Sequence, residues 1–434
     1  MTAPRRPAIR TAADLRGRRA VVLGLARSGV AASRFLADAG ADVTVYDRRP
    51  AAELDSAVAE LGGRVVQLAL GIDTTAAVEL VEGADLLVTS PSVSPRFPTT
   101  DPWLREALLA AETRGAEIVS EVDLFLRLTR ARILGVTGTK GKTTTSSLLA
   151  AMLEAGGVPC VLGGNIGTPL VERALKLDPD TWAVLELSEL QLPTIGRGAD
   201  VAVYTNIGAD HLDRHGSVEA YRAVKARLAE LSVAQGRVVL NRDDPGCREL
   251  GDRLPPESLA WYALDRSDGQ DAWIEHGWVT VAGERLLPAS EVPLPGRHML
   301  ANVLAAVVGA SLAGASTQAI ADAIRGFPGV PHRLETVRMH DGVRWVNDSQ
   351  ATIPAAAIAA LEAFDQPIVL ITGGKDKGMD YAALADAIAE RARAAVLMGE
   401  TADELAALIG DRVPVHRAGS MEEAVTTVAR LTEP

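Results

Sequence analysis

The chain has 434 residues, of which 47% are hydrophobic and 23% charged, and its formal net charge is −12. This length predicts about three domains at roughly 150 residues each, and the negative charge argues against nucleic-acid binding as the main activity. We find no apolar run of about 18 residues and no secretory signal, so we expect no membrane span. The two cysteines, Cys160 and Cys247, offer no disulfide framework and suit a reducing cytoplasm.

The first part of the chain, residues 1–129, is predicted to be a Rossmann-like domain. A strand, a glycine turn and a helix over 30–39 lead to a second strand, which ends at Asp47 about 20 residues after the turn. Ala26 stands where a second glycine would admit a pyrophosphate, which favours another nucleotide over NAD. Ser92 follows a strand end, where open α/β sheets bind ligands. Strands are expected at 20–23, 43–46, 64–68, 85–88 and 117–119.

The second part, residues 130–327, opens with a predicted phosphate-binding loop. A strand over 133–137 is followed by Gly138-Thr139-Lys140-Gly141-Lys142-Thr143-Thr144 and a helix over 145–155. Glycines let backbone N–H groups approach phosphate oxygens, and the helix N-terminus adds positive potential. Lys142 is placed to reach the β- and γ-phosphates, and Thr143 to bind Mg²⁺. Only two residues separate Gly138 from Gly141, so this loop is shorter than the common P-loop.

Acidic side chains follow the next strands of this part. Glu186 lies in the last residues of a strand predicted at 182–187, which makes it a candidate Mg²⁺ ligand. Asp210, His211 and Asp213 share one loop after the strand at 201–204 and suggest a second cation. Asn241, after a strand at 238–240, is a candidate nucleoside contact.

Pro and Gly cluster at 327–331, which we take as the boundary of a third α/β domain, residues 328–434. Strands are expected there at 344–346, 367–371, 394–398 and 413–415, with helices between them. The predicted fold class is therefore α/β with three domains: a Rossmann-like domain, a P-loop-type ATPase domain with a parallel sheet, and a second Rossmann-like domain. From the residues alone, an ATP-dependent ligase or kinase, a nucleotide-dependent switch and an NAD oxidoreductase all remain open.

The chain resembles the Mur ligases from about residue 17 to residue 423. Within that family it is most similar to the branch that joins glutamate to UDP-N-acetylmuramoyl-L-alanine. The matching segments are GVTGTKGKTT (135–144), GGNIGTPL (163–170), LELSELQL (185–192), TNIGADHLDRH (205–215), YRAVK (221–225), NRDD (241–244), PHR (331–333), NDSQAT (347–352) and GGKDKGMDY (373–381).

The resemblance implies a role for each matching residue. UDP-substrate contacts are implied for Arg27, Ser28, Asp47, Arg48, Arg49, Ser92, Asn165, Ser188 and Gln191. ATP contacts are implied for residues 138–144, Asn241, Arg333 and Asp348. Metal ligands are implied at Thr143, Glu186, His211 and a carbamylated Lys225, and glutamate contacts at Thr352 and Lys377. Lys142, His211 and Lys225 are implied to be catalytic.

The implied reaction uses ATP and two Mg²⁺ ions in the cytoplasm, with UDP-N-acetylmuramoyl-L-alanine and glutamate as partners, and proceeds through an acyl phosphate. We expect a monomer. The chain departs from the family pattern at Gln350, where a lysine is usual, and at Glu189-Leu190, where Ser-Phe is common. Its third domain is expected to be truncated, since the family normally continues past position 434 with a segment that helps to hold D-glutamate. An L-glutamate-adding relative and a non-catalytic ATP-binding paralogue remain alternatives.

Overall fold

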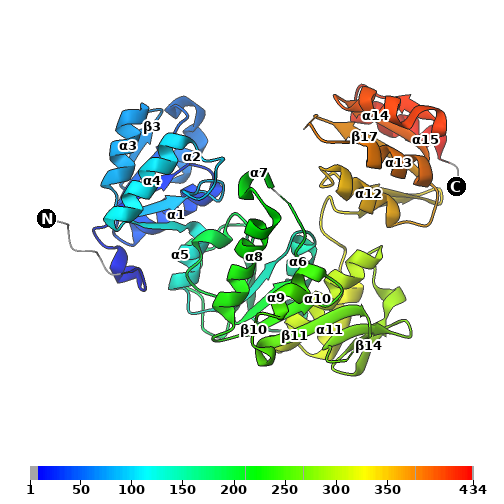
Figure 1. Cartoon of the computed structure of the whole chain (residues 1–434), viewed down its shortest axis with the longest axis horizontal. Helices are drawn as coiled ribbons and strands as arrows, with labels where there is room; N and C mark the ends of the chain where they lie inside the picture. Colours follow the sequence, from blue (N-terminus) through cyan, green and yellow to red (C-terminus); the bar gives the residue numbers. More distant parts are fainter. Residues whose placement is uncertain (1–7, 211, 267, 377, 433–434) are drawn as a thin grey trace. The chain divides into compact units, whose positions relative to one another are not determined.

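The computed structural model describes residues 8–210, 212–266, 268–376 and 378–432. Their contacts divide the chain into two compact units (Figure 1). One comprises Met1–Ala289 with Ala301–Ile324, and the other Ser290–Leu300 with Arg325–Pro434. Among the described residues, no helix has the length and apolar character needed to cross a bilayer.

The N-terminal sheet has five described strands, all parallel, in the order β3-β2-β1-β4-β5. One face packs against α3 and α4 through a core that includes Val21 and Leu108, and the other packs against α1 and α5. Helices on both faces of a parallel sheet confirm the Rossmann-like prediction. The elements are β1 (Arg19–Leu23), α1 (Arg27–Asp38), β2 (Asp42–Asp47), α2 (Asp55–Glu60), β3 (Val66–Leu70), α3 (Thr74–Gly83), β4 (Leu86–Thr89), α4 (Pro102–Arg114), β5 (Glu117–Ser120) and α5 (Glu121–Leu128).

The central sheet has nine described strands in the order β14-β13-β12-β11-β10-β9-β6-β8-β7. The pairs from β7 to β12 are parallel, and β13 and β14 add an antiparallel edge. The strands are β6 (Arg132–Thr137), β7 (Cys160–Gly164), β8 (Trp182–Glu186), β9 (Val201–Tyr204), β10 (Arg237–Asn241), β11 (Leu259–Asp265), β12 (Ala272–Glu275), β13 (Trp278–Val281) and β14 (Glu284–Pro288). The helices are α6 (Lys142–Ala155), α7 (Leu212–His215), α8 (Val218–Ser232), α9 (Pro245–Gly251), α10 (Arg297–Leu312) and α11 (Thr317–Gly326).

One hydrophobic core joins the N-terminal and central sheets. It runs from Val22 and Val45 through Phe125 on α5 to Ile133 and Ala202, all fully or almost fully buried. This shared core explains why both sheets belong to one compact unit. The predicted boundary after residue 129 falls between α5 and β6 and remains a prediction.

The C-terminal unit contains a parallel sheet in the order β17-β18-β19 and a separate hairpin of β15 and β16. Apolar side chains of α12, α13 and α14 pack in one core, and those of α15 pack in a second core with Val396 and Ile371. This arrangement agrees with the predicted α/β class, although β15 was not predicted. The elements are β15 (Glu335–His340), β16 (Val343–Asn347), α12 (Pro354–Glu362), β17 (Ile368–Gly374), α13 (Ala382–Arg391), β18 (Ala392–Gly399), α14 (Ala402–Ile409), β19 (Val415–Arg417) and α15 (Met421–Leu431).

Candidate active site

The predicted phosphate loop lies between β6 and α6, as expected. The helix begins at Lys142, three residues before the predicted start at Thr145, so Thr143 and Thr144 belong to its first turn. The ammonium group of Lys142 donates to the carbonyl oxygens of Gly138 (2.9 Å) and Thr139 (3.0 Å). Burial lowers the pKa of Lys142, while the carboxylates of Glu186 and Glu189 act to raise it. The lysine is therefore held over its own loop at the N-terminus of a helix, where an anion is stabilised.

Two glycines of the loop are required by close contacts. Gly141 has a φ of +85°, and a Cβ there would overlap the side-chain amide of Asn302 on α10. At Gly138 a Cβ would overlap the Thr205 hydroxyl. At these two positions the backbone therefore leaves no room for a side chain.

We expect Gly141→Ala to weaken ATP binding at least tenfold. A left-handed conformation costs a non-glycine residue about 1–2 kcal/mol, and the new methyl group would also displace Asn302. Calorimetric titration with ATP tests this. Gly156→Ala at the other end of the same helix is the control, because Gly156 has a φ of −80°. Equal ATP affinities for the two variants would refute the prediction.

The loop is fastened to the segment after β9. The Thr139 N–H donates to the Asn206 carbonyl (2.9 Å), and the Gly208 N–H donates to the Thr139 hydroxyl (2.9 Å). Lys140 forms an ion pair with Asp210 at 3.0 Å. Asp210, which the sequence suggested as part of a cation cluster, is thus engaged with the loop. His211 lies outside the described residues.

Lys225 comes to the same place from α8. Its side chain is fully buried, and its ammonium group donates to the Thr137 hydroxyl (3.2 Å) and the Gly138 carbonyl (3.0 Å). Burial, together with the nearby charge of Lys142, lowers the pKa of Lys225 to about 7. The Glu189 carboxylate lies 3.8 Å from this ammonium group. A buried lysine titrating near neutrality is typical of functional sites.

Glu186 ends β8, next to β6 in the sheet, and is 1% exposed. Its Oε1 atom accepts a hydrogen bond from the Asn165 amide (2.7 Å), whereas its Oε2 atom is buried with no hydrogen-bond partner in the described chain. Asn165 therefore orients the carboxylate, a role beyond the substrate contact that the resemblance implied. A buried carboxylate oxygen of this kind fits a cation ligand.

The described side chains of this site include some, but not all, of the ligands that a cation needs. Among the described residues, which exclude His211, no three His, Cys, Asp or Glu side chains gather closely enough to hold a metal ion. Mg²⁺ at nucleotide sites usually takes one or two carboxylates and completes its shell with phosphates and water. Glu186 and the Thr143 hydroxyl at the start of α6 fit that requirement.

The loops that follow β8, β9 and β10 are stabilised by the polar side chains of Ser188, Gln191 and Asn241. The Gln191 side-chain carbonyl accepts from the N–H (3.0 Å) and hydroxyl (3.2 Å) of Ser188, and both side chains are buried. The Asn241 amide donates to the Thr205 carbonyl (3.1 Å) and its oxygen accepts from the Asp243 N–H (3.0 Å). Each of these polar side chains thus stabilises a loop of the site.

The predicted UDP contacts of the N-terminal sheet lie at the carboxyl ends of β1, β2 and β4, which are adjacent. Asp47, at the end of β2, accepts from the Leu25 N–H (2.9 Å) and from the Arg49 side chain and N–H (2.9–3.0 Å). The Arg27 guanidinium donates to the Gly167 carbonyl of the central part (2.5 Å). Ser28 is half-buried near the start of α1, and Arg48 and Ser92 are exposed.

Asp47 should make stability depend on pH. Burial alone would raise its pKa, but the hydrogen bonds from Arg49 and Leu25 lower it to about 2. An unfolded Asp titrates near 3.9, so the stabilisation, about 1–2 kcal/mol, is complete above about pH 5 and is lost as the pH falls towards 2.

We therefore expect Asp47→Asn to lower the urea midpoint at pH 7 and to match the unmodified chain more closely at pH 3. Asp42→Asn, at the exposed start of the same strand, is the control. A loss of stability that is the same at both pH values would rule out this carboxylate as the source.

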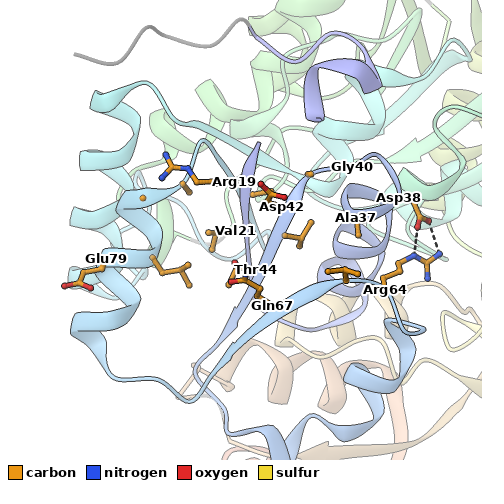
Figure 2. Close-up of a pocket in the computed structure, with 17 residues that line it drawn as sticks. Arg19, Val21, Ala37, Asp38, Gly40, Asp42, Thr44, Arg64, Gln67 and Glu79 are labelled. Atoms are coloured by element: carbon orange, nitrogen blue, oxygen red, sulfur yellow. Dashed lines mark hydrogen bonds and ion pairs between the residues drawn. The ribbon is translucent and has the colours of Figure 1, made fainter. Parts of the chain in front are cut away.

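A cavity of about 810 Å³ opens towards the amino-terminal ends of the strands of the N-terminal sheet (Figure 2). It is lined by Arg19 and Asp42, which begin β1 and β2, and by Thr44, Gln67 and Glu79. Among the predicted site residues that the structure describes, none lines this cavity. The predicted UDP contacts at the carboxyl ends of β1 and β2 are therefore separated along these strands from the residues of the cavity that begin them.

In the C-terminal unit, Arg333 and Asp348 are brought together. Arg333 lies between His332 and Leu334, whose φ angles are +63° and +45°. The Leu334 N–H donates to the Asp348 carboxylate (3.0 Å) and the Gln350 N–H to the His332 carbonyl (3.1 Å). Non-glycine residues with positive φ often mark functional segments.

Of the two predicted glutamate contacts of this unit, Thr352 lies within the described residues. The Thr352 N–H donates to the Gln350 carbonyl (2.9 Å), and Lys377 lies outside the described residues. Burial lowers the pKa of His298, while the Asp348 charge acts to raise it, so this histidine lies near the predicted nucleotide contact.

Each compact unit has one residue close to predicted site residues that was not itself a sequence candidate, Glu189 near Lys225 and His298 near Asp348. Glu189 had one signal, its departure from the family pattern, but its proximity to Lys225 depends on the pairing of distant segments. His298 follows Gly296 at the start of a helix, and the sequence does not reveal its proximity to Asp348.

Family models and relatives of known proteins match most of the chain and point to the same family. Residues 136–310 match the Mur ligase middle domain, and residues 332–434 match the Mur ligase, glutamate ligase domain. A UDP-N-acetylmuramoylalanine–D-glutamate ligase from Solibacter usitatus is 41% identical over 412 residues, covering 95% of this chain and 89% of that protein. The protein of the same name from Symbiobacterium thermophilum is 37% identical, with 96% and 91% covered.

Solved structures agree at the level of fold. The UDP-N-acetylmuramate–alanine ligase of Thermotoga maritima aligns with a TM-score of 0.59 at 16% identity, covering 96% of this chain and 93% of that one. A pseudomurein peptide ligase type C from Methanothermus fervidus aligns with a TM-score of 0.57 at 20% identity, covering 96% and 95%.

Proposed function

Because the chain belongs to the Mur ligase family, we propose that it joins D-glutamate to UDP-N-acetylmuramoyl-L-alanine at the expense of ATP, in peptidoglycan precursor synthesis. The observation that carries this proposal is the convergence of Lys142, Lys225 and Glu186 at one edge of the central sheet. A ligase needs cationic groups at one place because they offset the negative charges of ATP and of the carboxylate substrate that reacts with it.

The first step transfers the γ-phosphoryl group. The alanyl carboxylate attacks the γ-phosphorus, ADP leaves, and an acyl phosphate forms. The backbone N–H groups of residues 138–144 and the helix N-terminus bind the phosphates, and Lys142 offsets the charge that moves to the leaving oxygen. The loop conformation is stabilised by the hydrogen bond from Thr139 to Asn206 and by the ion pair of Lys140 with Asp210.

The second step forms the amide bond. The glutamate amine attacks the acyl carbonyl, and phosphate leaves from a tetrahedral intermediate. A positive charge near the developing oxyanion lowers this barrier, and Lys142 is the group we assign to it. Burial of the surrounding side chains limits hydrolysis of the acyl phosphate by water.

Mg²⁺, when bound, would neutralise the phosphate oxygens. We assign Thr143 and Glu186 to one ion, and His211 with a carbamylated Lys225 to a second. Asn165 fixes the Glu186 carboxylate for that purpose. Carbamylation would replace the ammonium group of Lys225 by an anionic oxygen ligand, and the pKa of about 7 supports it because a neutral amine is needed to react with CO₂.

The remaining assignments concern binding. The UDP moiety would be held by Arg27, Ser28, Asp47, Arg48, Arg49 and Ser92. Ser188 and Gln191 would contact the UDP-linked substrate, Asn241, Arg333 and Asp348 would contact the nucleotide, and Thr352 and Lys377 would contact glutamate. We further propose that the chain acts as a monomer in the cytoplasm, with domains at 1–129, 130–327 and 328–434.

The experiment is phosphate release from ATP with Mg²⁺ and UDP-N-acetylmuramoyl-L-alanine, with D-glutamate and L-glutamate in parallel. Release that depends on D-glutamate is expected. Release with L-glutamate alone would change the named product, and no release with either amino acid, despite ATP binding, would overturn the proposal.

A further inference from the structure

Glu189 is a buried acid close to Lys142 and Lys225, and the reaction just described does not use it. It is 6% exposed, and its Oε2 atom lies 3.8 Å from the Lys225 ammonium group. Its charge also acts on Lys142 and on the Tyr221 phenol. Burying a carboxylate is costly unless cations or hydrogen bonds surround it, and Glu189 faces two lysines.

The backbone that carries Glu189 is fixed. The Leu187 N–H donates to the Val136 carbonyl (2.8 Å), and the Thr137 hydroxyl donates to the Leu187 carbonyl (2.7 Å). After it, the Gln191 N–H donates to the Ser188 carbonyl (3.1 Å), which closes a turn around Glu189. The acid is therefore presented from a pinned turn beside β6, as binding residues are when a site is preorganised.

A second, independent feature beside Glu189 indicates a cation. Glu186 lies three positions earlier, and its buried Oε2 atom has no hydrogen-bond partner within the described chain. Glu189 forms an ion pair with Lys225 at 3.8 Å, while that ammonium group donates to Thr137 and Gly138. Two buried carboxylates, one with an unused oxygen, match the hard oxygen ligands that Mg²⁺ prefers.

We propose that Glu189 is an additional carboxylate of the divalent-cation site, acting beside Glu186. This inference rests on the proposed function for its place in the reaction, but it concerns cation binding and is tested without turnover. In the absence of the cation, the same carboxylate balances the charges of Lys142 and Lys225.

The test is titration of the full chain with Mn²⁺ alone, followed by electron paramagnetic resonance of the free ion, without and then with a non-hydrolysable ATP analogue. We expect Glu189→Gln to bind Mn²⁺ at least tenfold more weakly while it remains folded at the temperature of the titration. Glu186→Gln should show a loss of similar size. Glu154→Gln, at the exposed end of α6, is the matched control and should bind normally.

Mn²⁺ binding by Glu189→Gln at the control's affinity would overturn the proposal. If that variant does not fold, Glu189→Asp keeps the charge on a shorter side chain, and a several-fold weaker Mn²⁺ affinity is expected, with unchanged affinity again overturning it. The outcomes separate from those of the proposed function. A chain that needs Glu189 for Mn²⁺ but releases no phosphate would refute the ligase and keep the cation site.

Discussion

Replacement of Lys142 by alanine is expected to reduce D-glutamate-dependent phosphate release by about 1,000-fold, in line with the loss of a charge that stabilises phosphoryl transfer. The lysine belongs to the first turn of α6 and its ammonium group is held by the carbonyl oxygens of Gly138 and Thr139. Lys140, by contrast, is engaged with Asp210, so it cannot readily take over.

The measurement is kcat and KM for ATP, together with the thermal midpoint. Because burial already lowers the pKa of Lys142, its removal should not destabilise the fold, and the loss should fall mainly on kcat. Lys176→Ala, at an exposed lysine, is the control and should behave as the unmodified chain does. A Lys142→Ala variant with normal kcat would show that the loop's charge is not needed.

The parts of the site that lie close together in sequence were predictable. A strand, a glycine loop and a helix within residues 131–155 form a local unit, and the structure confirms it with the helix beginning earlier, at Lys142. The carboxyl ends of β6, β8, β9 and β10 meet because those strands are parallel neighbours, so placing Glu186 and Asn241 near the loop required only the fold class.

What the sequence could not provide was the pairing of distant side chains. Lys225 is an ordinary helical lysine by pattern, and only the packing of α8 against the core shows that it is buried at the loop. The contact of Glu189 with it depends on the turn at 188–191. The strand β15 also escaped prediction, because most of its residues are exposed and show no clear alternation.

Replacement of Lys225 by alanine is expected to abolish ligation, with partial recovery when acetate is added. The variant removes a buried side chain of full lysine length and leaves space beside Thr137 and Gly138, which a small carboxylate can occupy. Acetate would there supply the anionic oxygens that we assign to the carbamate. The variant Lys225→Arg fills the space with a permanent charge, and should be inactive and not rescued.

Carbamate formation can be read directly by ¹³C NMR after equilibration with labelled bicarbonate. Because the pKa of Lys225 is lowered to about 7, its neutral form is a minority at pH 6 and the majority at pH 8, and the carbamate signal at fixed CO₂ should rise over that interval. The signal should vanish in Lys225→Ala. Full activity of Lys225→Ala without acetate would refute the assigned role, and a signal unaffected by the substitution would place the modification elsewhere.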